Sequence, residues 1–167
     1  YAGNITMNQG TDFTFSSSAD QILSGIISDD GTGNGNNDVN MSGSGTLTLT
    51  GTNTYTGRTF INSGTVEIGG SGTLGSGSYA GLITNNGTLE YTSDQAQTLS
   101  DNITGTGALV KDGSSSVLTL SGNNGYSGTT TIDQGTVQAG STNALSTASD
   151  FTVNSGGILQ LNGFDNT

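Results

Sequence analysis

The sequence predicts an all-β protein built as a parallel β-helix, a solenoid of about seven coils. Residues 47–69 return 71 positions later as residues 118–140, with 13 of 23 positions identical and no gap. Such a long repeat in register means that one supersecondary unit is built more than once. Short segments that alternate apolar and polar residues recur between glycine-containing turns, and the composition suits a narrow stacked core.

A turn of the form Asn/Asp-x-Gly marks a shorter period inside the repeat. Its copies lie at positions 8–10, 62–64, 85–87, 133–135 and 154–156, so the first and third gaps are about twice as long as the other two. We interpret the two long gaps as two periods each and expect coils of roughly 21 to 27 residues. Alternating segments such as 65–68 and 88–91 follow the turns, and they have the period of a strand with one buried face. Two or three such strands per period make one coil.

Gly, Ser, Thr and Asn make up 96 of the 167 residues, a composition near that of disordered chains. Only 9% of the residues are charged, however, which is low for a disordered chain. A solenoid accounts for both facts, because each coil needs few inward aliphatic residues when these stack on the next coil. The absence of proline leaves every backbone donor available to the stacked sheets.

The chain has no cysteine and no histidine, and its only cations are Arg58 and Lys111. Most acid-base, metal and phosphate chemistry therefore lacks its usual residues, and we expect no enzyme, no catalytic residue, no cofactor and no metal site. The net charge of −11 argues against nucleic acid and anionic lipid as partners. No apolar run is long enough to cross a bilayer, so we expect no direct membrane insertion.

A family resemblance is carried by residues 105–113, which lead into residues 118–137. This string, with Lys111 and the Asn-x-Tyr-Ser-Gly motif around Tyr126, resembles the passenger-associated transport repeat of AIDA-type autotransporters. These are proteins that Gram-negative bacteria export by type V secretion. We place the strong copies at 43–77 and 113–148, the first lacking the lysine, and take residues 1–167 as one continuous segment of a longer passenger domain.

The resemblance implies a right-handed, single-stranded parallel β-helix at the bacterial cell surface, or secreted. A C-terminal translocator barrel, absent from this chain, would export it and anchor it in the outer membrane. The implied function is a structural stalk within an adhesin or an autoaggregation and biofilm factor, a role linked to virulence. Implied partners are a host cell surface, a matrix protein or a neighbouring bacterial cell. The alternatives are a segment that itself binds host glycan or matrix protein along one face and, more remotely, a carbohydrate-active β-helix enzyme.

Residues 29–38 form the most acidic and glycine-rich segment, and their oxygen atoms would suit Ca²⁺. The segment does not match an EF-hand loop, because Met41 stands where the bidentate glutamate belongs. It also lacks the tandem nonapeptides of an RTX calcium site. We expect a solvated loop, and it is our first candidate for a binding surface because such loops carry binding on solenoids.

Tyr55 and Tyr126 occupy equivalent repeat positions. They would form either a ligand-stacking platform or, as we favour, rings that cover the open corner of each coil. The turn residues Asn62, Asn85, Asp133 and Asn154 would similarly be ligands or, as we favour, a hydrogen-bonded ladder of stacked turns.

Glu67 and Glu90 are the best candidates for an enzymatic carboxylate pair. Each follows a Gly-Thr-apolar turn, and on neighbouring coils they would lie about 5 Å apart. Gln138 and Gln160 follow the later turns at the same place, which indicates an outward position that tolerates an amide. An ice-binding array of threonines is also disfavoured, because the spacing between turns is irregular.

Overall fold

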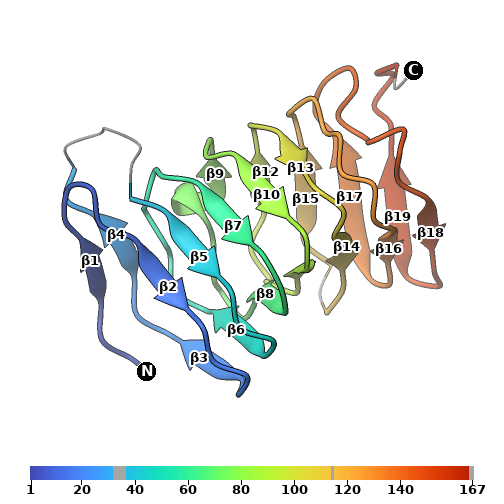
Figure 1. The fold of residues 1–167 in the computed structure, drawn as a ribbon. Helices are drawn as coiled ribbons and strands as arrows, with labels where there is room; N and C mark the ends of the chain where they lie inside the picture. The colour runs from blue at the N-terminus through green and yellow to red at the C-terminus, as the bar shows by residue number, and fades with distance from the viewer. Residues whose placement is uncertain (32–36, 114, 166–167) are drawn as a thin grey trace.

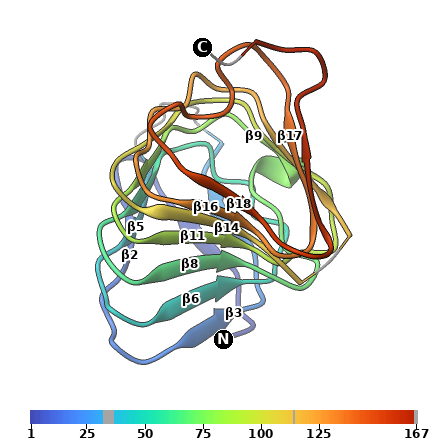
Figure 2. The ribbon, with the colours of Figure 1, turned by 90° about the vertical axis from the view of Figure 1, so that its right-hand side faces the viewer.

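The chain forms a parallel β-solenoid of about seven coils in the computed structural model, which describes residues 1–31, 37–113 and 115–165. All strand pairs are parallel between successive coils, and the stack runs from the N-terminal to the C-terminal end in Figure 1. Viewed along the stack, the coils enclose a three-sided cross-section (Figure 2). The predicted parallel β-helix is therefore confirmed. No helix in the described ranges is long and apolar enough to cross a membrane.

Two sides of the solenoid are single continuous sheets. The first side has five strands: β2 (Phe13–Phe15), β5 (Val39–Met41), β7 (Thr59–Ile61), β10 (Ile83–Asn85) and β13 (Ile103–Thr104). The second side has seven strands: β3 (Gln21–Leu23), β6 (Thr46–Leu49), β8 (Thr65–Ile68), β11 (Thr88–Tyr91), β14 (Ala108–Lys111), β16 (Thr130–Ile132) and β18 (Phe151–Val153).

The third side is divided into two sheets. The shorter sheet pairs β1 (Ile5–Met7) with β4 (Ile27–Asp29). The longer sheet contains β9 (Ser78–Tyr79), β12 (Gln97–Leu99), β15 (Val117–Leu120), β17 (Gly135–Ala139) and β19 (Gly157–Gln160). A short 3-10 turn, η1 (Gly75–Gly77), precedes β9 and lies beside this division. The third side is thus the one whose ladder is interrupted.

The core is a set of inward columns that run the length of the stack. On the second side, Leu47, Val66, Leu89 and Leu109 follow one another in register, and each is almost completely buried. The alternate positions of the same strands face outward, which is the period of a strand with one buried face. Few aliphatic residues per coil therefore suffice for a continuous core.

Coil length is not constant along the stack. The register pair of Leu118 with Val137 closes a short coil, whereas the pair of Phe13 with Val39 closes a clearly longer one. This longer coil contains residues 29–38, and another long coil, which contains η1, runs from Thr59 to its register partner Ile83. In the η1 coil the extra residues lie between β8 and β9, outside the strands, so the inward and outward faces are kept.

The two repeat copies lie on different sides of the solenoid. β7 belongs to the first side, whereas β16, its counterpart in the second copy, belongs to the second side. Likewise β8 lies on the second side and its counterpart β17 on the third. The repeat therefore advances the chain by three coils and one additional side.

The same turn chemistry at all three corners explains this rotation. Gly10, Gly64 and Gly135 each end an Asn/Asp-x-Gly turn, with φ of 71°, 64° and 79°. Gly10 lies at the corner from the third side to the first, Gly64 from the first to the second, and Gly135 from the second to the third. A left-handed φ is accessible to glycine without a Cβ clash, so one turn motif serves any corner. Sequence spacing alone could not distinguish the corners.

Candidate functional site

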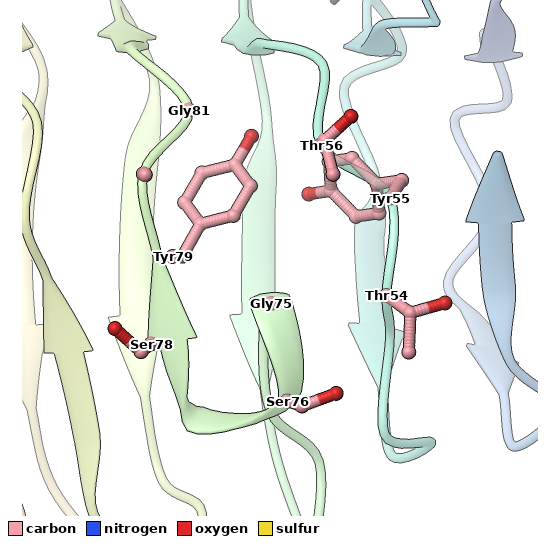
Figure 3. A pocket seen from close by; sticks show the side chains of 9 residues that line it. Thr54, Tyr55, Thr56, Gly75, Ser76, Ser78, Tyr79 and Gly81 are labelled. Atoms are coloured by element: carbon pink, nitrogen blue, oxygen red, sulfur yellow. The ribbon is translucent and has the colours of Figure 1, made fainter. Parts of the chain in front are cut away.

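A pocket of about 210 Å³ opens on the third side, between the coil that contains Tyr55 and the next coil toward the C-terminus (Figure 3). Tyr55 and Tyr79 line its inner end, with ring centroids 5.4 Å apart in an edge-to-face arrangement. Both side chains are almost completely buried. The remaining lining residues are small, uncharged and mostly exposed: Thr54, Thr56, Gly75, Ser76, Ser78, Ala80 and Gly81.

The pocket lies where the backbone ladder of the third side is broken. Asn53 is still bonded to the coil above, through Asn53 N to Thr73 O (2.9 Å) and Ser76 N to Asn53 O (3.1 Å). The ladder resumes on the first side, where Thr59 N donates to Leu82 O (3.0 Å). Between these points, no backbone hydrogen bond joins residues 54–56 to residues 78–81, all of which the structure describes.

The η1 turn causes this break. Gly75, Ser76 and Gly77 have φ values of 54°, 55° and 96°, three consecutive residues in the left-handed region. The two glycines adopt this conformation without a Cβ clash, and together they turn the chain out of the ladder before β9 begins. Sequence reasoning missed the pocket. The available signal was the Gly- and Ser-rich run 69–78, in a coil longer than its neighbours.

Tyr55 and Tyr126 are internal and do not form an exposed platform. Both are fully buried, and each hydroxyl is hydrogen-bonded to a threonine one strand later, Thr59 (2.8 Å) and Thr130 (2.7 Å). Burial raises the pKa of Tyr55 to about 12, so the phenol remains neutral. The ligand-stacking hypothesis is wrong. Our preferred interpretation was close in assigning a structural role, but the rings lie inside the coil instead of covering a corner.

Two inward asparagines, which the sequence analysis did not identify, connect successive coils. The side chain of Asn53 accepts from Ile27 N (2.9 Å) in the coil below and donates to Thr73 O (3.2 Å) in the coil above. Asn124, its repeat counterpart, accepts from Ile103 N (2.7 Å) and donates to Ala144 O (2.5 Å). Each side chain thus forms hydrogen bonds with buried backbone groups of the two neighbouring coils. Such groups are costly to leave unpaired inside the core.

Of the predicted ladder of turn residues, only the contact between Asp133 and Asn154 is formed. Asn154 donates to the carboxylate of Asp133 (2.6 Å) on the neighbouring coil, as expected. Asn62 and Asn85 do not stack, because Asn85 pairs in register with Ile61. Asn85 consequently points inward and donates to Ala108 O (2.8 Å). Between these two coils, paired residues on the first side are one position further apart in the sequence than paired residues on the second side. This difference moves Asn85 into the core.

The acidic segment 29–38 lies partly outside the described residues, since positions 32–36 are not described. Of its described carboxylates, Asp29 accepts from the backbone and hydroxyl of Thr56 (2.8 and 2.6 Å). Asp38 accepts from Arg58 N (2.7 Å). In the ranges that the structure describes, no three potential metal-ligating side chains come together. These two carboxylates bind backbone amides of the next coil.

Glu67 and Glu90 are direct neighbours on the outer surface of the second side, as predicted. The carboxylate of Glu67 accepts hydrogen bonds from Thr48 Oγ1 (2.8 Å) and Thr92 Oγ1 (2.6 Å). The pKa of Glu90 is raised by partial burial and then by the charges of Glu67, Asp112 and Asp133. Gln138 and Gln160 pair with each other on the third side, so they do not extend this column.

We expect Glu90→Gln to stabilise the protein at neutral pH and to have little effect near pH 4. The pKa of Glu90 is higher in the folded state than its ordinary value of 4.5, so the folded protein loses stability as the pH rises above that value and the carboxyl ionises. Glu90 is partly exposed, so the gain should be only about 0.5 kcal/mol. The free energies of unfolding of the variant and the unmodified protein, from urea denaturation at pH 4 and pH 7, check this prediction.

Glu67→Gln is the matched control for this prediction. It removes the same charge pair, but it also removes one of the carboxylate oxygens that accept from Thr48 and Thr92. We expect no net gain at neutral pH from this variant. A stability difference for Glu90→Gln that does not change with pH would contradict the assignment of its raised pKa.

Lys111 is a buried cation on the inner face of β14. Its side chain is fully buried in the column between Tyr91 and Ile132. The ammonium group donates to Asp112 O (3.1 Å) and lies 5.6 Å from the centroid of the Tyr91 ring. Burial lowers its pKa. The lysine of the repeat lead-in therefore places its charge at the corner that follows β14, while its aliphatic stem fills the core.

These features define the class of protein. It is a parallel β-solenoid in which most of the residues shared by the repeats are internal and hold successive coils together. The family model described as the passenger-associated transport repeat matches residues 39–68 and 109–139. A curated relative, an adhesin BmaC autotransporter from Brucella suis, is 38% identical over 144 residues.

Both findings support the resemblance to an autotransporter passenger with passenger-associated transport repeats that the sequence showed. The alignment with the Brucella protein covers 66% of this chain but only 4% of the relative's length. The relationship implies extracellular or cell-surface display. No solved structure matches the chain.

Proposed function

We propose that this segment is a structural stalk within a larger surface adhesin or autoaggregation factor. Seven coils at about 4.8 Å each give a rod section of about 35 Å. Anchoring through a C-terminal translocator barrel, with a host cell, a matrix protein or a neighbouring bacterium as the partner of the whole protein, belongs to this proposal. The adhesin relative supports a non-enzymatic role for the segment.

The observation that carries the proposal is the orientation of the shared repeat residues. The pairs Asn53 and Asn124, and Tyr55 and Tyr126, are all buried and bonded within the stack. Outward positions are less well preserved: Thr48 and Thr119 are identical, but Glu67 is replaced by Gln138, and the copies lie on different sides. A repeated recognition surface would need the same outward residues on the same side. The repeat therefore preserves residues that hold successive coils together.

Deletion of one whole coil tests the stalk function in the full-length, surface-displayed protein. Removing residues 88–107 joins Gly87 to Ala108, which takes the place of Thr88 in register. Because stability in a solenoid is the sum of neighbouring contacts, we expect folding, display and cell adhesion to be retained. Display is measured with an antibody to a distal tag, and adhesion by cell binding. Loss of adhesion with normal display would show that this coil carries binding itself.

The isolated segment provides the second test. As a stalk it should bind neither cells nor matrix proteins with useful affinity, and replacing residues 29–38 with a short turn should change nothing. Binding that this replacement abolishes would instead make the segment an adhesin in its own right. Glycan cleavage that is lost in the Glu67→Gln, Glu90→Gln double variant would establish the enzyme alternative.

A further inference from the structure

We propose that the pocket at the break in the third side is a binding subsite for a single neutral sugar ring. The inference goes beyond the stalk function and does not depend on it. It rests on three features of the pocket: unpaired backbone, unengaged hydroxyl groups and the absence of charge from its lining.

The backbone along both edges of the pocket lacks its ladder partners. Residues 54–56 and 78–81 face each other without a backbone hydrogen bond, whereas the ladder is intact below, where Thr54 N donates to Ile27 O (2.9 Å). The side chain of Tyr79 spans the break instead, and its hydroxyl donates to Gly57 O (2.6 Å). Peptide groups that would pair in an unbroken sheet are therefore available to water or to a ligand with hydroxyl groups.

The rim adds hydroxyl groups that have no partner in the described part of the chain. Thr54, Ser76 and Ser78 are exposed, and their Oγ atoms make no hydrogen bond there. Elsewhere on this side, serine hydroxyls are used within the solenoid: Ser100 donates to Tyr79 O (3.1 Å) and Ser141 to Ser121 O (2.7 Å). The pocket rim thus carries hydroxyl groups that make no hydrogen bond within the described part of the solenoid.

The lining offers no charged side chain to pair with an ionic ligand, and its size suits a compact molecule. The lining has no charged residue, and Asp29, which accepts from Thr56 beside the pocket, has a lowered pKa and stays ionised. With the net charge of −11, this disfavours anionic ligands. A volume of 210 Å³ holds about seven waters, the size of one sugar ring, and is smaller than the roughly 300–1,000 Å³ pockets of drug-sized ligands.

The arrangement matches the way a pyranose is recognised. Its hydroxyl groups can donate to and accept from the rim and the open backbone, while the buried Tyr55 and Tyr79 form the floor behind them. Figure 3 shows the rings of Tyr55 and Tyr79 between the two coils, with Thr54, Ser76 and Ser78 around them. A ligand of this size with few anchoring contacts should bind with a Kd of about 1 mM.

The test is a titration of the ¹⁵N-labelled segment with the methyl glycosides of glucose, galactose, mannose and N-acetylglucosamine, followed by amide chemical shifts. Sorbitol at the same concentration controls for a general polyol effect. We expect at least one glycoside to shift the amides of residues 54–56 and 75–81 saturably, with sorbitol ineffective. No saturable shift in these residues with any of the four glycosides would overturn the proposal, since the pocket would then hold water only.

Two filling variants and one matched control locate the site. Ser78→Leu and Thr54→Leu place a larger apolar side chain at opposite edges of the pocket, and both positions are exposed, so the fold should tolerate them. Thr98→Leu makes a comparable change at the residue paired with Ser78 on the next strand, outside the pocket. We expect at least a tenfold loss of affinity for the first two and no change for the third. Affinity that survives both filling variants would overturn the proposal.

Discussion

Asn124→Ala is expected to lower the melting temperature by about 10 °C in a circular-dichroism melt, since for a chain of this size 1 kcal/mol corresponds to about 2–4 °C. The substitution leaves Ile103 N and Ala144 O buried without the partners that the asparagine supplies. Each unpaired buried group costs about 1–3 kcal/mol, so we expect a loss of about 4 kcal/mol.

Asn123→Ala is the matched control, at the preceding residue. The Asn123 side chain is exposed and makes no hydrogen bond among the described residues. We therefore expect a melting temperature within about 1 °C of the unmodified protein, since surface substitutions away from special features stay within about 0.5 kcal/mol. Equal effects at the two positions would mean that the inward amide does not hold the coils together.

The second large effect is expected for Gly128→Ala. A Cβ at this position would fall against the backbone carbonyl of Gly107 in the coil below, far inside van der Waals contact. Backbone atoms cannot move aside as a flexible side chain can, so the two coils must separate. We expect a loss of about 3 kcal/mol, at the upper end for overpacking, again read from the melting temperature.

Gly125→Ala provides the comparison three residues earlier in the same coil. A Cβ there meets nothing within 4 Å, and its φ is not in the left-handed region. We expect this variant to be as stable as the unmodified protein, or slightly more stable because alanine restricts the unfolded chain. A Gly125→Ala variant that is as unstable as Gly128→Ala would indicate a requirement for backbone flexibility and not for close approach.

The strands themselves were largely predictable from local sequence. Alternation located β8 and β11 in the segments that follow the turns. The reason is that a strand in a solenoid needs only an alternating pattern and a turn at each end, and both are local properties. The inward residues followed from the same alternation.

The assignment of strands to sides was not predictable. The repeat pattern was consistent with whole coils, but β7 and β16 lie on different sides. A one-residue difference in coil offset between adjacent sides also turned Asn85 inward while Asn62 stayed outside. Both outcomes depend on how coils of unequal length stack on each other, and spacing along the chain does not contain that information.

The sequence by itself determined the parallel β-solenoid, the approximate number of coils and the family resemblance, because each depends on local patterns that recur. Only the tertiary structure decided the rotation of the repeat by one side, the internal position of Tyr55 and Tyr126, and the pocket beside η1. These arise from contacts between successive coils, which are distant along the chain, and a single glycine-rich turn can break one ladder there and leave the other two continuous.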